Sequence, residues 1–233
     1  MTVLRRGATV NHGRLNSMCA LSQPSMLVIE AARVYDAEAA ALVGVFARYG
    51  YRWKVHSNDP AWPEPAWPTR ASISLSIERF DPTFVHFALH GVEQGLVLRA
   101  RERLGSRDED ILAWSDIEEM SVWKEKIVVT GACGALPYAS SFLNAGALAV
   151  VAPNLPINWG NLCHFFRIFY SNLLDGNSIG EALSATKLYA RVHYRKYDSM
   201  GVEGDQHWRL KGGGEDTAQP GACTRTAGSA SRR

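Results

Sequence analysis

Short apolar runs, separated by polar segments or by glycine and proline, recur along the middle of the chain. They lie at residues 25–30, 51–56, 84–90, 127–133 and 147–152. Runs of this length that are bounded by turn residues are typical of strands buried on both faces of a parallel sheet. We therefore expect a central sheet that is mostly parallel.

Between these runs, apolar residues recur at helical spacing. The pattern predicts helices over residues 37–48, 70–80, 138–144, 158–174 and 178–195. In the first helix the expected buried stripe consists of Ala40, Leu42, Val43 and Phe46, with Asp36 as the N-cap. Strands that alternate with helices predict an α/β domain with helices on both faces of the sheet.

Capping signals refine two helix starts. Ser178 is followed three residues later by Glu181, which is a capping-box pattern. Residues 92–125 are more polar, and their apolar pieces at 95–99 and 111–114 predict a hairpin-like insertion. Ser115 or Asp116 is then the expected cap of a short helix.

A proline-rich segment at residues 59–68 carries the repeated tripeptide Ala-Trp-Pro. Proline removes a backbone donor and fixes φ, so this segment is neither helix nor central strand. We interpret it as a rigid loop whose tryptophans cover the core, with docking of a partner as the alternative.

Charge is unevenly distributed, although the net charge is only +2. Residues 1–23 hold arginines and no acid, and residues 212–233 are also basic, so the region between them is slightly acidic. We expect a flexible extension at 1–23, one folded domain at 24–211 and a disordered tail at 212–233. The folded domain offers no basic surface for nucleic acid.

The chain shows no sign of a membrane or of an oxidising compartment. No apolar run reaches the roughly 18–20 residues of a membrane span. The arginines near the start lack a following hydrophobic stretch, which argues against a secretory signal and leaves a transit peptide as an alternative to a loose extension. The four cysteines are scattered without a Cys-x-x-Cys pair, which favours a reducing, cytoplasmic setting and no zinc ribbon.

Two of the predicted strands end in reactive side chains that glycine follows at once. Residues 84–91 end in His90-Gly91, and residues 127–134 end in Cys133-Gly134. Because the carboxyl ends of parallel strands share one sheet edge, these residues are expected to meet. A thiol beside an imidazole suits nucleophilic catalysis, and the N–H groups of Gly91 and Cys133 could form an oxyanion hole.

The helix expected from Tyr138 would direct its positive end at the Cys133 thiol and favour the thiolate. The alternative is that Cys133 is an inert buried thiol and His90 a hydrogen-bonded strand end. Elsewhere, Cys163 and His164 are adjacent on a helix and cannot form a dyad with each other. His193 is expected on a helix surface. Three further histidines lack matching ligands, so no metal site is expected; they are His12, His56 and His207.

The two strand ends, together with three further segments, resemble the CHAT domain. The segments are 84–91, 112–120, 127–134, 141–152 and 165–190. This family is caspase-like and belongs to the clan of cysteine peptidases that includes caspases, separases and gingipains. The resemblance covers residues 25–195 and implies a caspase-like three-layer α/β sandwich.

By this resemblance, Cys133 is the nucleophile, His90 the catalytic histidine, and Gly91 and Cys133 the oxyanion donors. His86, four residues before His90, is expected on the same side of the strand as second-shell or core support. The implied activity is that of an endopeptidase that cuts a specific protein partner through an acyl-enzyme, without a cofactor. An activator or companion protein and a role in bacterial signalling or defence are also implied.

The sequence departs from the family pattern in three places. Residues 134–136 replace a polar pair after the cysteine, and residues 158–159 stand where an acid is common. Gly131 stands two residues before Cys133, where relatives that cut after Arg or Lys carry an acid. Three other acids could line the specificity pocket, although we interpret each as a solvated charge: Glu93, Asp108 and Asp116.

These departures keep a second hypothesis open, a catalytically inactive caspase-like module for protein interaction. A third hypothesis is a flavodoxin-like nucleotide binder, because that sheet also uses its strand ends. The chain lacks the Gly-x-Gly-x-x-Gly and Walker phosphate loops that such a binder requires.

Overall fold

A six-stranded sheet forms the middle layer of the computed structural model, which describes residues 23–31, 38–99, 110–156, 162–194 and 198–210. The strand order is β2-β1-β3-β7-β8-β9. The first five strands in this order are parallel, and β9 pairs antiparallel with β8. The strands are β1 (Ser25–Glu30), β2 (Arg52–Ser57), β3 (Phe84–Ala88), β7 (Ile127–Thr130), β8 (Ala149–Pro153) and β9 (Met200–Gly204).

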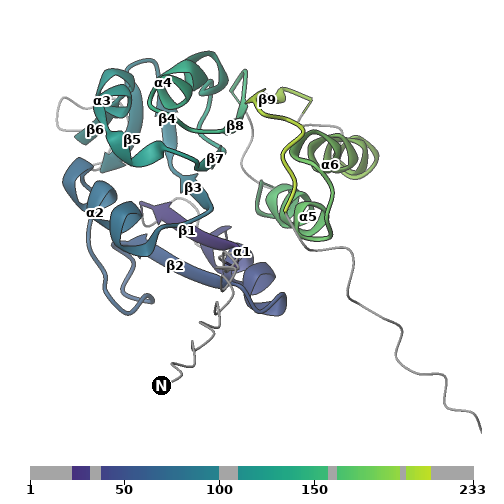
Figure 1. Cartoon of the computed structure of the whole chain (residues 1–233), viewed down its shortest axis with the longest axis horizontal. Helices are drawn as coiled ribbons and strands as arrows, with labels where there is room; N and C mark the ends of the chain where they lie inside the picture. Colours follow the sequence, from purple (N-terminus) through teal and green to yellow (C-terminus); the bar gives the residue numbers. More distant parts are fainter. Residues whose placement is uncertain (1–22, 32–37, 100–109, 157–161, 195–197, 211–233) are drawn as a thin grey trace, which may run out of the picture.

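Helices cover both faces of this sheet (Figure 1). One layer holds α1 (Glu38–Arg48), α5 (Leu162–Leu174) and α6 (Ile179–Tyr194). The other layer holds α2 (Arg70–Phe80), α3 (Trp114–Glu119) and α4 (Ala139–Asn144), with the short 3₁₀ turns η1 (Ser121–Trp123) and η2 (Leu136–Tyr138). Successive strand residues alternate between the two cores, which explains why the strands read as unbroken apolar runs. The predicted fold class is confirmed.

The predicted insertion is a separate antiparallel sheet of three strands: β4 (His90–Val92), β5 (Gly95–Arg99) and β6 (Asp110–Ala113). It lies beside α3 and α4 in Figure 1. The prediction of a single strand that runs through His90 was wrong in one respect. The chain bends at the buried residue Leu89, so β3 ends at Ala88 and His90 begins β4.

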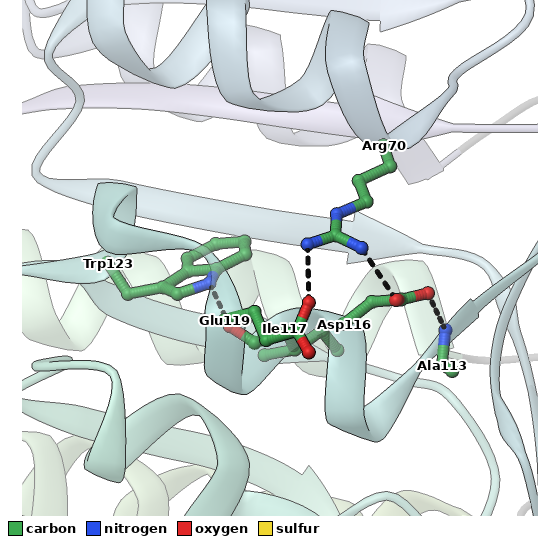
Figure 2. Close-up of polar contacts among 6 residues, drawn as sticks. All are labelled: Arg70, Ala113, Asp116, Ile117, Glu119 and Trp123. Atoms are coloured by element: carbon green, nitrogen blue, oxygen red, sulfur yellow. Dashed lines mark hydrogen bonds and ion pairs between the residues drawn. The ribbon is translucent and has the colours of Figure 1, made fainter.

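Arg70 of α2 and Trp123 of η1 hold the short helix after β6 (Figure 2). The guanidinium of Arg70 contacts the carboxylates of Asp116 at 2.7 Å and Glu119 at 3.0 Å. The expected cap was wrong, because the N-cap is Ala113 and Asp116 is the third helical residue. Its carboxylate accepts a hydrogen bond from the Ala113 N–H at 3.3 Å, which satisfies a donor at the helix start.

Two other local predictions have opposite outcomes. The capping box of α6 is confirmed, since the Ser178 N–H donates to Glu181 at 2.8 Å and the Glu181 N–H donates to the Ser178 hydroxyl at 3.3 Å. The stripe of α1 was wrong at two positions: Ala40 is exposed and Val43 only half-buried. Ala39 and Val45 are buried instead, because the buried face of the helix is rotated toward Glu38, which reaches the sheet.

The proline-rich segment places its tryptophans against the two cores. Trp62 packs on the core shared with α1 and α5, and Trp67 packs on the opposite core. The prediction of a core-covering loop is therefore confirmed.

Strand β9 was not predicted, since its five residues include two glycines and only two apolar side chains. Some predicted features lie outside the described residues: Asp36, residues 158–161, Arg195 and nearly all of both predicted tails.

Candidate active site

The register between β3 and β7 brings the two reactive strand ends to one place. Phe84 pairs with Ile127 and Phe87 with Thr130, so the offset in residue number is constant along the pair. His90 follows β3 after the bend at Leu89, and Cys133 follows β7 three residues after Thr130. Both residues are half-buried at the carboxyl edge of the sheet, where parallel α/β sheets hold their ligands.

The backbones of Gly91 and Cys133 are in direct contact. A Cβ atom on Gly91 would lie 2.5 Å from the Cys133 carbonyl oxygen and 2.9 Å from its nitrogen. No side chain fits there without moving one of the two backbones. The structure therefore brings the backbones of Gly91 and Cys133 together, and His90 is the residue next to Gly91 in the chain.

The turn that carries Cys133 is anchored to β3 by a buried hydroxyl. Thr130 donates a hydrogen bond to the Phe87 carbonyl at 3.0 Å and accepts one from the Ala132 N–H at 3.0 Å. The Ala135 N–H then donates to the Ala132 carbonyl at 3.3 Å, which closes a turn around Cys133 and Gly134. Gly134 has φ of +64°, a left-handed conformation that favours glycine.

The chain after this turn enters the 3₁₀ turn η2 before the six-residue helix α4. The helical segment thus begins at Leu136, slightly before the expected Tyr138. The effect of its positive end on the Cys133 thiol stays a prediction.

His86 lies at the centre of a buried polar cluster beneath the candidate site. Its Nε2 is 2.7 Å from Glu38 Oε1, and its Nδ1 is 3.1 Å from the Tyr170 hydroxyl. Burial raises the pKa of Tyr170 well above its usual value, so this hydroxyl keeps its proton. Both contacts are satisfied when Tyr170 donates to Nδ1 and Nε2–H donates to Glu38. The cluster joins β3 to α1 and α5, in keeping with a supporting role for His86.

Gly131 has no room for the acid that some relatives carry at this position. A Cβ there would lie 2.2 Å from Leu162 Cδ2 and 3.3 Å from Phe166 Cε2. Helix α5 therefore packs directly on the backbone two residues before Cys133. Of the other acids considered, Glu93 is exposed, Asp116 pairs with Arg70, and Asp108 lies outside the described residues.

Two buried acids near this edge were missed by the sequence reasoning. Glu38 binds His86, and Glu30 ends β1 with 2% of its surface exposed. Burial raises the pKa of Glu30, as do the nearby Asp59 and Glu38, while Ser57 and Trp62 lower it. An acid that ends an apolar strand was the available signal for Glu30.

The remaining candidates do not converge with this site. On α5, Cys163 is half-buried and His164 exposed, and His193 and His207 are exposed as well. His56 contacts the hydroxyls of Ser76 and Ser72 at 3.0 and 3.3 Å. His12 lies outside the described residues, within which no group of three potential metal ligands occurs.

A mostly parallel sheet between two helical layers is the arrangement of the caspase-like fold. The structure is similar to that of the complex of Porphyromonas gingivalis RgpB pro- and mature domains, with a TM-score of 0.60 and 14% identity. The match covers 80% of this chain and 48% of that chain, so this chain spans less than half of its length. The structure of drICE is also similar, with a TM-score of 0.48, 11% identity, and coverage of 79% and 89%. These identities show a likeness of fold alone.

The chain belongs to the CHAT domain family, whose model matches residues 5–200. This result confirms the resemblance to the CHAT domain, and the likeness of fold to the RgpB structure agrees with it. No curated protein matches the chain. Among the described residues, no helix combines the length and apolar character that crossing a membrane requires.

Replacing Gly91 with alanine should strain the candidate site. Because the new Cβ would collide with the Cys133 backbone, we expect Gly91→Ala to lower the free energy of unfolding by about 1–3 kcal/mol. Gly44→Ala is the matched control: Gly44 lies on the exposed side of α1 with open space around a Cβ, and the variant should gain about 0.5–1 kcal/mol. Urea denaturation measures both, and equal stability of Gly91→Ala and the native protein would contradict the contact.

Removing the Tyr170 hydroxyl should destabilise the buried cluster. Tyr170→Phe leaves His86 Nδ1 without its donor, at an expected cost of about 1–3 kcal/mol. Tyr138→Phe is the control, because the half-buried ring of Tyr138 stacks on Trp114 without depending on its hydroxyl. Thermal unfolding should separate the two variants, and equal midpoints would show that the cluster contributes nothing.

Proposed function

We propose that this chain is a cysteine endopeptidase with Cys133 as the nucleophile and His90 as the general acid and base. The observation that carries the proposal is the contact between the Gly91 and Cys133 backbones, which supports a close approach of the thiol and the imidazole. Membership of the CHAT domain family and the caspase-like fold agree with this activity. No cofactor enters the proposed reaction.

In the proposed reaction, His90 takes the thiol proton and the Cys133 sulfur attacks the carbonyl carbon of the scissile peptide. The N–H groups of Gly91 and Cys133 stabilise the oxyanion that forms. As the C–N bond breaks, His90 gives its proton to the leaving amine, and a thioester remains on Cys133. His90 then takes a proton from water, which hydrolyses the thioester and restores the thiol.

His86 supports this dyad without touching the reacting atoms. It lies four residues before His90 and binds Glu38 and Tyr170, so it fixes β3 against α1 and α5. We propose a protein substrate and an activating companion protein for the domain, by analogy with the family.

A second candidate function is an inactive module that binds partners through the same fold. The packing of Leu162 on Gly131 favours it, because an apolar side chain occupies space beside the residue two before Cys133. Site-specific alkylation distinguishes the two functions. A peptidase should show alkylation of Cys133 that slows about tenfold in His90→Ala, whereas a module should show equal rates in both proteins.

The decisive test is the loss of cleavage in Cys133→Ala. We expect new protein N termini to appear when the native protein is added to an extract of its own cells. The rate at which these N termini appear should fall by about 10³-fold or more in Cys133→Ala, because no other group replaces the nucleophile. Cys163→Ala, which changes the half-buried thiol of α5, is the matched control and should cleave normally. Unchanged cleavage by Cys133→Ala would end the proposal.

A further inference from the structure

The strand β2 forms one edge of the large sheet (Figure 1). Within the described residues it pairs only with β1, and the proline-rich segment covers one end of its other side, where the Ala66 N–H donates to the Ser57 carbonyl at 2.8 Å. An uncovered edge presents backbone donors and acceptors with which another extended chain can pair. The rest of this edge can therefore accept a further strand.

The Ser57 carbonyl shows which backbone groups of β2 point outward. Because it binds Ala66, it points away from β1. Alternate residues of a strand direct their N–H and C=O groups to the same side, so Trp53 and Val55 direct theirs outward as well. Apart from the ladder with β1, no backbone hydrogen bond joins these two residues to any part of the chain that the structure describes. An added strand would pair with these groups.

A groove of about 240 Å³ lies between β2 and α2 at this edge. Lys54 and His56 line it on the strand side. On the helix side, Leu75 is 44% exposed although it is a large apolar side chain. The helix residues that line the groove have the spacing i, i+3, i+4 and i+7 of a single helix face, and they are Ser72, Leu75, Ser76 and Arg79. A strand added to β2 would direct alternate side chains toward this groove.

The charge in this groove favours carboxylates. Lys54 of β2 and Arg79 of α2 both line it, and Glu64 is the acid among the described residues that do so. Burial lowers the pKa of His56, as does Lys54, so the imidazole is neutral at pH 7 and adds no charge. The side chains of an added strand that enter the groove should therefore be acidic.

The opposite face of β2 presents apolar side chains. Trp53 is 39% exposed, and its ring lies 6.5 Å from that of Trp62 in an edge-to-face arrangement. Val55 is half-buried and packs against the core that α1 and α5 cover. Because strand residues alternate between the two faces, the remaining side chains of an added strand would contact Trp53 and Val55. These side chains should be apolar.

We propose that the β2 edge binds an extended segment of a partner protein, which adds a strand to the sheet. In this segment, acidic side chains that contact Lys54 and Arg79 alternate with apolar side chains that contact Trp53 and Val55. The inference does not depend on the proposed peptidase activity, because β1 and β3 lie between β2 and β7.

A second copy of this chain fits the edge poorly. Arg52 and Lys54 lie on the same face of β2, and neither face of the strand carries an acid. Two copies paired through β2 would therefore bring their cations together, and like charges on neighbouring strands are destabilising. An acidic partner gains from the same cations.

The first test compares two fluorescein-labelled hexapeptide amides by fluorescence anisotropy. One alternates valine with glutamate and the other alternates valine with lysine. We expect the glutamate peptide to bind with a Kd below about 1 mM and the lysine peptide to bind at least about tenfold more weakly, because two ion pairs are replaced by repulsion.

Charge reversal in the groove should reverse this preference. The double variant Lys54→Glu with Arg79→Glu should bind the lysine peptide at least about tenfold more tightly than the glutamate peptide. Arg79 is exposed and Lys54 half-buried, and thermal unfolding checks that the variant is folded. Arg167→Glu, which changes an exposed cation on α5, is the matched control and should keep the native preference.

N-methylated peptides test strand addition on the native protein, so this test does not depend on any variant. With the acids directed toward α2, the valine N–H groups face β2 in antiparallel addition and the glutamate N–H groups face it in parallel addition. Methylating the set that faces β2 should weaken binding at least about tenfold, and methylating the other set should change it less than about threefold.

Three results would overturn the inference. The first is the absence of binding by the glutamate peptide at about 1 mM, the concentration that marks weak affinity. The second is an equal effect of both methylation patterns, which would show that no strand forms. The third is a dimer of the native protein that the charge-reversal variant dissociates, which would assign the β2 edge to a second copy.

Discussion

The fixed register between β3 and β7 is the constraint on which the candidate site depends. His90 and Cys133 are far apart in sequence, yet one constant pairing offset aligns both strand ends. The Thr130 hydroxyl ties the turn after β7 back to β3, and Gly91 allows the two backbones to touch. A slip of one residue would turn every side chain of β7 to the opposite core, so packing enforces the alignment.

The two faces of the sheet differ in the side chains that are buried on them near this edge. On one face, α2, α3 and α4 cover a large apolar cluster, and the buried His56 of β2 contacts Ser76 of α2. On the other, α1 and α5 enclose Glu38, His86 and Tyr170, which are joined by hydrogen bonds. Hydrogen bonds constrain direction as well as distance. This cluster therefore fixes α1 and α5 against β3, the strand that leads to His90.

Most of the fold could be predicted because strands that are buried on both faces appear in the sequence as continuous apolar runs. The capping box at Ser178, and the apolar runs that lead to His90 and Cys133, are also patterns of neighbouring residues. The prediction failed where tertiary contacts decide. Glu38 turns α1 toward His86, which no periodicity reveals, and Leu89 bends the chain so that His90 starts a second sheet. The edge strand β9 is too short and glycine-rich to stand out. The hydrogen bond between Glu30 and Trp62 joins residues far apart in the sequence, so no local pattern predicts it.

The bend at Leu89 divides the proposed dyad between two sheets. Cys133 follows a strand of the large parallel sheet, whereas His90 is the first residue of the small antiparallel one. The gap between sulfur and imidazole is therefore a measure of how the two sheets are inclined to each other. A partner that tilts the small sheet would change this distance without approaching the cysteine.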